Sequence, residues 1–166
     1  GGQGVWTDYM KSLDKEGSTT LDSYGNALYK YPYVNKNIKN RKTIVLDAHV
    51  DEIAFIVKDI TSKGYIKVDT LGGSDISITP SSRVTIWTFK KTPIKGVFGH
   101  PAIHIHRREF KSSLNNTFVD IGVSSKKEVL KLGIEIGNPI VMEGDFQELG
   151  GYYCGKALDD KIGGFI

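Results

Sequence analysis

The stretch that decides the fold is TIVLDAHVDE, residues 43–52, in which an apolar run leads into a group of polar side chains. Thr43 to Leu46 is short, apolar and rich in β-branched residues, which predicts a buried strand. His49 and Asp51 lie two residues apart and therefore point to the same side of an extended backbone. They follow the predicted strand, at the position where open α/β sheets bind ligands. The stretch therefore predicts an α/β domain with a candidate site at His49 and Asp51.

Two interpretations of His49 and Asp51 are open at this point. A neutral imidazole is a good zinc ligand, and a neighbouring carboxylate can fix its tautomer and raise its basicity. The alternative is a polar strand end with a solvated histidine, because a single His-x-Asp pattern is a weak signal for metal. Further ligands elsewhere in the chain would favour the metal site.

A second group of carboxylates occurs in GKALDDKIGG, residues 155–164. Asp159 and Asp160 are adjacent, and neighbouring carboxylates repel each other unless a cation or the course of the backbone separates them. A carboxylate has two oxygens and can bridge two metal ions. The alternative is the ordinary preference of a helix N-terminus for negative charge. The apolar residues Ile162, Phe165 and Ile166 predict that a buried helix begins here.

The remaining sequence predicts two kinds of structure. An amphipathic helix is expected over Val5 to Leu13, and strands over Ile53 to Ile60 and Tyr65 to Val68. A capping box at Ser125 and Glu128 predicts a helix further along the chain. Short β-rich runs recur at the spacing of a small barrel or sandwich over Arg83 to Phe89, Ile94 to Phe98, Phe118 to Val123 and Ile140 to Met142. We therefore expect part of an α/β domain in residues 1–70, an inserted β-rich domain in residues 71–148, and a return to the first domain in residues 149–166.

The composition argues against several classes of function. The chain has 22 Lys plus Arg and 19 Asp plus Glu, a net charge of +3, without the dense basic patch of a nucleic-acid-binding protein. No apolar run approaches the roughly 18 residues of a membrane span. Cys154 is the single cysteine and cannot form an internal disulfide, which fits a reducing compartment and predicts a cytoplasmic protein. The first residues lack a methionine and the last lie within an apolar stretch, so we expect an incomplete chain.

Together the two motifs resemble those of the glutamyl aminopeptidase family M42. Residues 48–53, AHVDEI, resemble the family's first metal motif, and residues 155–160, GKALDD, resemble its second, with Lys161 in place of the more usual arginine. Further matches lie between them in the same order, at residues 72–73, 83–86, 96–99, 103–104, 118–122, 124–126 and 132–137. The resemblance implies an α/β metallopeptidase domain, phosphorylase/hydrolase-like, with an inserted PDZ-like or barrel domain. Relatives use that inserted domain to build large homo-oligomers such as dodecamers.

Carried over by position, the resemblance implies a dinuclear metal site. His49 would bind one of two divalent ions, zinc or cobalt, and Asp159 would bridge both. Asp51 would be the catalytic-site residue that orients His49 without itself binding metal. The peptide bond between Asp159 and Asp160 would be cis. The implied reaction removes the N-terminal residue of a peptide substrate with a metal-activated water.

The family's catalytic glutamate, in a Glu-Glu pair, and its other metal ligands would lie beyond residue 166, so the chain as given is expected to be inactive. Two alternatives stay open. One is another metal-dependent hydrolase on this scaffold, since some relatives carry an endoglucanase label. The other is a non-catalytic assembly module. His100, His104 and His106 suggest a separate zinc cluster, but the family has a structural histidine at position 104, so we expect a structural role.

Overall fold

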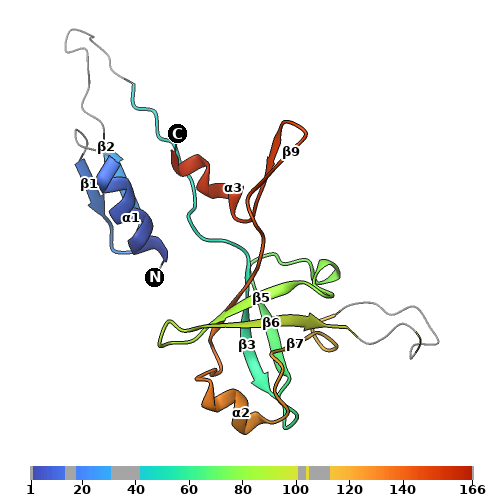
Figure 1. Ribbon diagram of the computed structural model, residues 1–166. Helices are drawn as coiled ribbons and strands as arrows, with labels where there is room; N and C mark the ends of the chain where they lie inside the picture. The colour runs from blue at the N-terminus through green and yellow to red at the C-terminus, as the bar shows by residue number, and fades with distance from the viewer. Residues whose placement is uncertain (1, 14–17, 31–41, 101–103, 105–112, 166) are drawn as a thin grey trace. The chain divides into compact units, whose positions relative to one another are not determined.

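The computed structural model describes residues 2–13, 18–30, 42–100, 104 and 113–165 (Figure 1). The chain divides into two compact units. One, here called the terminal unit, consists of Gly1–Glu52 and Ala157–Ile166. The other, the barrel unit, is Ile53–Lys156. No helix in the described ranges is long and apolar enough to cross a membrane.

Six antiparallel strands close the barrel unit into a barrel, with the order β3-β4-β7-β6-β5-β8. The strands are β3 Ala54–Ile60, β4 Ile66–Leu71, β5 Arg83–Trp87, β6 Pro93–Gly99, β7 Phe118–Asp120 and β8 Pro139–Met142. A 3₁₀ helix, η1 Ile76–Ile78, precedes β5. Closure pairs every strand on both sides, which removes the open edges that a flat sheet would present. The predicted small β-rich domain is therefore a closed barrel.

The barrel is larger than the insertion expected at residues 71–148. β3 and β4 belong to it, although both were expected in the domain before it. Phe55 in β3 pairs with Ile140 in β8, and Ile66 in β4 pairs with Val119 in β7. These two strands carry apolar side chains that the other barrel strands cover, so the compact unit starts at Ile53 and ends at Lys156.

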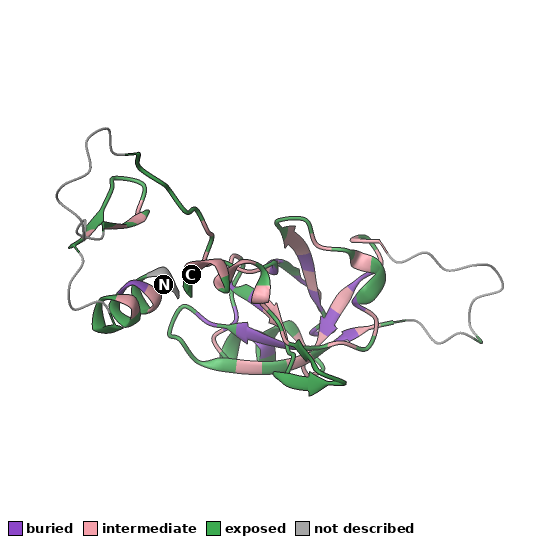
Figure 2. Cartoon of the chain, turned by 90° about the horizontal axis from the view of Figure 1, so that it is seen from above, coloured by how far each residue is buried: buried purple, intermediate pink, exposed green. Residues whose placement is uncertain are grey.

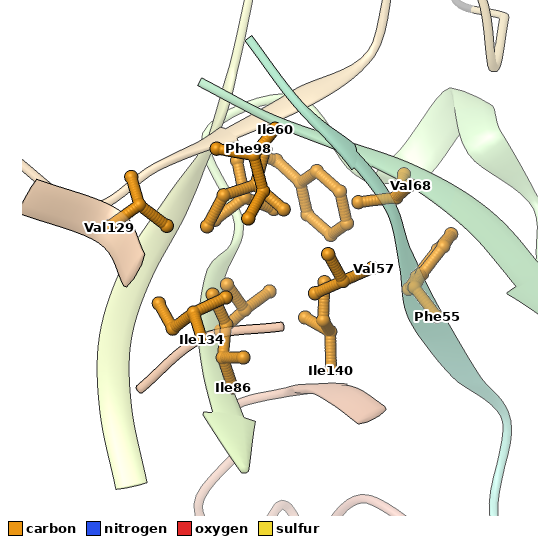
Figure 3. Packing of buried hydrophobic residues seen from close by; sticks show 12 residues of the cluster. Phe55, Val57, Ile60, Val68, Ile86, Phe98, Val129, Ile134 and Ile140 are labelled. Atoms are coloured by element: carbon orange, nitrogen blue, oxygen red, sulfur yellow. The ribbon is translucent and has the colours of Figure 1, made fainter. Parts of the chain in front are cut away.

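The barrel core is a single apolar cluster (Figure 3). Phe55 and Phe98 face each other across it, with ring centroids 4.9 Å apart in an edge-to-face arrangement. Its buried members are Phe55, Val57, Ile60, Ile66, Val68, Val84, Ile86, Phe98, Val119, Val129, Ile134 and Ile140. Figure 2 shows the buried residues gathered on the barrel strands. The main hydrophobic contribution to stability from the described residues therefore lies in the barrel unit.

The helix α2, Lys126–Lys131, has the predicted capping box and adds Val129 to the barrel core. The Ser125 hydroxyl accepts a hydrogen bond from the Glu128 backbone N–H at 3.3 Å, and Glu128 Oε2 accepts one from the Ser124 N–H at 2.9 Å. The Ser124 N–H and then the Ser125 hydroxyl hold the pKa of Glu128 below its usual range. Gly133 ends the helix at φ +83°, a conformation that glycine adopts without steric cost.

A two-stranded hairpin, β9 Gln147–Leu149 and β10 Tyr152–Cys154, follows the barrel strands within the barrel unit. All residues of its two strands are exposed. The rings of Phe146 and Tyr153 stack with centroids 5.4 Å apart.

The terminal unit begins with helix α1, Gly2–Leu13, and a hairpin of β1 Ser18–Leu21 and β2 Ala27–Lys30. The predicted helix over Val5 to Leu13 is thus confirmed and starts three residues earlier. The Trp6 ring meets the Phe165 ring edge-on, with centroids 4.8 Å apart. Phe165 belongs to a 3₁₀ helix, η3 Gly163–Phe165, so the two ends of the chain pack together in this unit.

Two expectations for the terminal unit are wrong. Thr43 to Leu46 forms no strand, and the side chains of Ile44, Val45 and Leu46 are exposed. None of the described strands pairs with this run, and a β-prone segment needs a partner to become a strand. The predicted buried helix after Lys161 is also absent from the described residues: η3 is a single short turn, and Ile162 and Phe165 are exposed. Ile166 lies outside the described residues.

Candidate metal centre

The first motif, His49 to Glu52, lies in a segment without regular structure at the end of the first part of the terminal unit. His49 Nδ1 is 3.1 Å from Asp51 Oδ1. The two side chains meet on one side of the backbone, as the spacing of two residues predicts. At this distance the Asp51 carboxylate can accept the Nδ1 proton and fix the tautomer of the ring.

The second motif is held in an irregular turn. Residues Leu158–Lys161 form α3, but Asp159 and Asp160 have non-helical backbone angles, and Ala157 before them has φ +59°. The bond between Asp159 and Asp160 is cis, as the resemblance implied. Asp160 Oδ1 accepts a hydrogen bond from the Gly163 N–H at 3.2 Å. The two adjacent carboxylates thus have different partners, which resolves the repulsion expected between them.

The two motifs meet at His49 and Asp159. His49 Nε2 lies 3.3 Å from Asp159 Oδ1, although about 110 residues separate them in the sequence. This distance falls in the range of roughly 3–5 Å expected for two atoms that each bind one metal at about 2 Å. The side chain of His49 is 55% exposed and that of Asp159 is 96% exposed. Both atoms can therefore be reached from solvent.

The donor chemistry of this pair fits a divalent cation. A neutral ring with its proton on Nδ1, toward Asp51, would present the Nε2 lone pair to a metal ion beside the Asp159 carboxylate. Two electron-rich groups at 3.3 Å are stable together when a cation lies between or beside them. Imidazole nitrogen and carboxylate oxygen suit zinc, cobalt and manganese. Among the described residues no cluster of three or more His, Cys, Asp or Glu side chains is arranged to hold a metal ion.

A second contact between the two segments involves residues to which the sequence patterns gave no role. Lys161 Nζ lies 4.0 Å from Glu52 Oε1, and both side chains are more protected than Asp159. The only sequence signal was the basic residue after Asp160, noted as a replacement for arginine. Nothing in the local pattern indicated that Glu52 would be its partner.

The barrel unit also contains histidines, two of which the structure describes. His100 and His104 are exposed, and neither is part of a potential metal cluster among the described residues. His106 lies outside the described residues, so the relation between His104 and His106 stays a prediction.

Comparisons with known proteins show what the chain resembles in sequence and in fold. Putative aminopeptidase FrvX of Escherichia coli (strain K12) is 39% identical over 148 residues, which are 87% of this chain and 40% of FrvX. The crystal structure of the TET aminopeptidase from Thaumarchaeota archaeon SCGC AB-539-E09 superposes with a TM-score of 0.81 at 29% identity, over 98% of this chain and 45% of that one. The TET1 peptidase of Pyrococcus horikoshii can assemble into a tetrahedron or a large octahedral shell. It superposes with a TM-score of 0.77 at 25% identity, over 94% of this chain and 46% of that one.

The present chain therefore spans less than half the length of these relatives. The model of the M42 glutamyl aminopeptidase family matches residues 32–166, which include both motifs and the whole barrel. Because this match covers most of the sequence, the chain belongs to the M42 glutamyl aminopeptidase family.

Proposed function

We propose that the full-length protein is a metal-dependent aminopeptidase that removes N-terminal residues from peptides. The observation that carries the proposal is the 3.3 Å approach of His49 Nε2 to Asp159 Oδ1, between two motifs that are distant in the sequence. Both motifs lie in the segment that matches the M42 family. The relatives named above are aminopeptidases or peptidases, which supports the same reaction here.

The site would hold two divalent ions, zinc or cobalt, with His49 binding one and Asp159 bridging both. Such ions supply a Lewis acid and lower the pKa of a water molecule. Within this chain, Asp51 keeps the Nε2 lone pair of His49 available by accepting the proton on Nδ1. Asp160 is held by the Gly163 N–H, which directs the turn so that Asp159 faces His49. The general base would come from the rest of the full-length protein.

Metal removal tests the proposal directly. We expect the full-length protein to release N-terminal residues from unblocked peptides and to lose this activity on dialysis against a strong chelator. Addition of zinc or cobalt should restore it, because His49 and Asp159 are donors suited to these ions. The measurement is the release of free amino acid, with metal content verified by mass spectrometry.

An N-acetylated peptide of the same sequence is the matched control, since an aminopeptidase needs a free amino end. Undiminished cleavage by verified metal-free protein would reject metal dependence. Hydrolysis of a β-glucan in place of the peptide, lost on chelation, would instead favour the metal-dependent endoglucanase-like alternative. If chelation left that hydrolysis unaffected, the reaction would use two carboxylates without metal, as glycoside hydrolysis commonly does.

We also propose that the barrel is the PDZ-like inserted domain of the family, that it serves in self-association and that it carries no catalytic residue. Exposed apolar side chains support this: Phe89 and Ile136 lie on neighbouring loops, since the Phe89 ring is 3.5 Å from the place that a Cβ on Gly137 would occupy. The assembly of the Pyrococcus horikoshii relative supports it as well. A cytoplasmic location would fit the single cysteine, Cys154.

Deletion of the barrel strands tests this role. Replacement of residues 54–142 of the full-length protein by a short Gly-Ser linker should convert a large homo-oligomer into smaller species, because the apolar contact surface is lost. Light scattering gives the mass, and circular dichroism shows whether the remainder is folded. A folded deletion variant with the same number of subunits would contradict the assembly role and would favour a barrel that only shields the active site.

A further inference from the structure

The His49–Asp159 pair is not able to hold itself together. Both side chains are largely exposed, and even an ion pair between them, with His49 protonated, would contribute only about 0–1 kcal/mol. The segment that carries His49 has no regular secondary structure to fix its course. The 3.3 Å approach must therefore be maintained by contacts of the neighbouring residues.

One such contact lies on the C-terminal side of Asp159. A Cβ added to Gly163 would lie 2.9 Å from Ala48 Cβ and 2.5 Å from Asp160 Oδ1. The backbone of the second motif thus lies directly against the residue before His49. This close packing fixes the separation of the two segments at one point.

The second contact is the ion pair of Lys161 with Glu52, at 4.0 Å. The Lys161 side chain is 37% exposed and that of Glu52 only 25%, so this pair is less screened by solvent than His49 and Asp159 are. It joins Glu52, in the first motif, to Lys161, which follows Asp160. Two points of contact, at Ala48–Gly163 and Glu52–Lys161, restrict the motion of one segment on the other to rotation about the line that joins them.

Charge makes Lys161 necessary in the metal-free protein. The two segments together bring Asp51, Glu52, Asp159 and Asp160 into one region, and like charges this close repel one another. Lys161 directly follows the second motif and pairs with one of these carboxylates, that of Glu52.

We propose that Lys161 is a positioning residue: its ion pair with Glu52 joins the two motifs before metal binds and holds His49 and Asp159 at ligand separation. This inference rests on the proposed metal-dependent function. Removal of Lys161 would change metal affinity in the opposite direction if the lysine acted only through its charge. A lysine that acted only through its charge would repel a divalent cation, so its removal would tighten metal binding. Removal of a lysine that positions the ligands would instead weaken metal binding. Part of the binding free energy would be spent on ordering the ligands that the lysine had held in place.

The experiment compares the zinc affinity of full-length wild-type protein with that of Lys161→Met, in competition with a chromophoric chelator. We expect Lys161→Met to bind zinc about 10–100-fold more weakly, the usual cost of removing a group that supports metal ligands. Lys161→Arg should stay within about threefold of wild type, because arginine keeps the charge and the length needed to reach Glu52. Equal or tighter binding by Lys161→Met would overturn the proposal.

Lys58→Met is the matched control. Lys58 is also a partly exposed lysine in an ion pair, with Asp69 at 2.8 Å, but it lies in the barrel unit. Its replacement should leave zinc affinity unchanged. A double-mutant cycle with Glu52→Gln identifies the pair: the double variant should cost little more than either single one, since each removes the same contact. Fully additive losses would contradict an ion pair between these two residues.

Hydrogen exchange of the metal-free protein separates this inference from the proposed function. Lys161→Met should increase amide exchange in residues 42–52 and 157–163, and Lys161→Arg should not. This result does not require metal or activity, so it would stand even if the wild-type protein bound no zinc. Unchanged exchange in both segments of a folded Lys161→Met variant would reject the positioning role, whatever the enzyme proves to hydrolyse.

Discussion

Replacement of Asp159 by asparagine is expected to lower kcat/KM for peptide hydrolysis by the full-length protein by more than roughly 100-fold. Loss of a residue that only supports a metal ligand typically costs about 10–100-fold, and Asp159 is proposed to bind metal directly. The amide has no negative charge and offers one acceptor oxygen in place of two. Asp159 lies 3.3 Å from His49, so a weaker ligand at this position affects the centre itself.

The same substitution should leave the fold intact. The Asp159 side chain is 96% exposed, and changes at such positions usually alter the free energy of unfolding by less than about 0.5 kcal/mol. Asp145→Asn is the matched control, because it makes the same chemical change at an exposed position of the barrel unit. Steady-state kinetics and thermal unfolding of both variants test the expectation. An Asp159→Asn enzyme with near wild-type turnover would remove Asp159 from the proposed site.

The second large effect concerns stability. Phe98→Ala is expected to destabilise the barrel by about 3–5 kcal/mol, the usual cost of deleting a buried aromatic ring. Phe98 is 1% exposed and loses its edge-to-face contact with Phe55. The barrel closes around a single cluster, so the surrounding strands cannot collapse into the space without breaking their pairing. Native-state hydrogen exchange of the barrel amides measures the loss within the full-length protein.

Phe89→Ala supplies the comparison for Phe98. Phe89 has the same side chain but is 63% exposed in the single chain, so its removal should change the stability of the unassembled barrel by no more than about 0.5 kcal/mol. Equal losses in the two variants would mean that the barrel core is not centred on the Phe55–Phe98 pair. In that case the exposed loop of Phe89 would itself be part of the stabilising contacts.

The elements that the sequence predicted well are those set by local chemistry. The capping box at Ser125 and Glu128 is complete within four residues, and α2 begins where it predicts. The short β-rich run from Ile94 to Phe98 lies within β6, Pro93–Gly99, because strand-forming residues bounded by turn residues are a local signal. Such signals need no knowledge of distant parts of the chain.

The errors arise where structure depends on distant partners. Thr43 to Leu46 has the composition of a buried strand, but none of the described strands lies beside it. The strand that begins at Ala54 was expected in the first domain. Nothing within this strand indicates that it pairs with β8, where Ile140 lies opposite Phe55. Pairing across such separations is a property of the whole fold, and strand propensity carries no information about it.

In the candidate site, too, local contacts could be predicted from the sequence and some contacts between distant residues could not. The spacing of His49 and Asp51 predicts that they point to one side, and the 3.1 Å contact agrees. The approach of His49 to Asp159 could be expected only because two motifs resembled one family in the correct order. The Glu52–Lys161 contact was not foreseen, because an ion pair between residues more than 100 positions apart depends on the final course of both segments.

The pairing of the first barrel strand with the last has a further consequence. β3 and β8 are antiparallel neighbours, so the chain arrives at Ala54 and departs after Met142 at the same end of the barrel, one strand spacing of about 5 Å apart. A module whose two ends are this close can be spliced into another protein's loop without stretching its host. During evolution the barrel can therefore be inserted, shortened or exchanged without changes in the sequence around it. The same property makes it suitable for engineering, because a foreign domain with closely spaced ends could take its place.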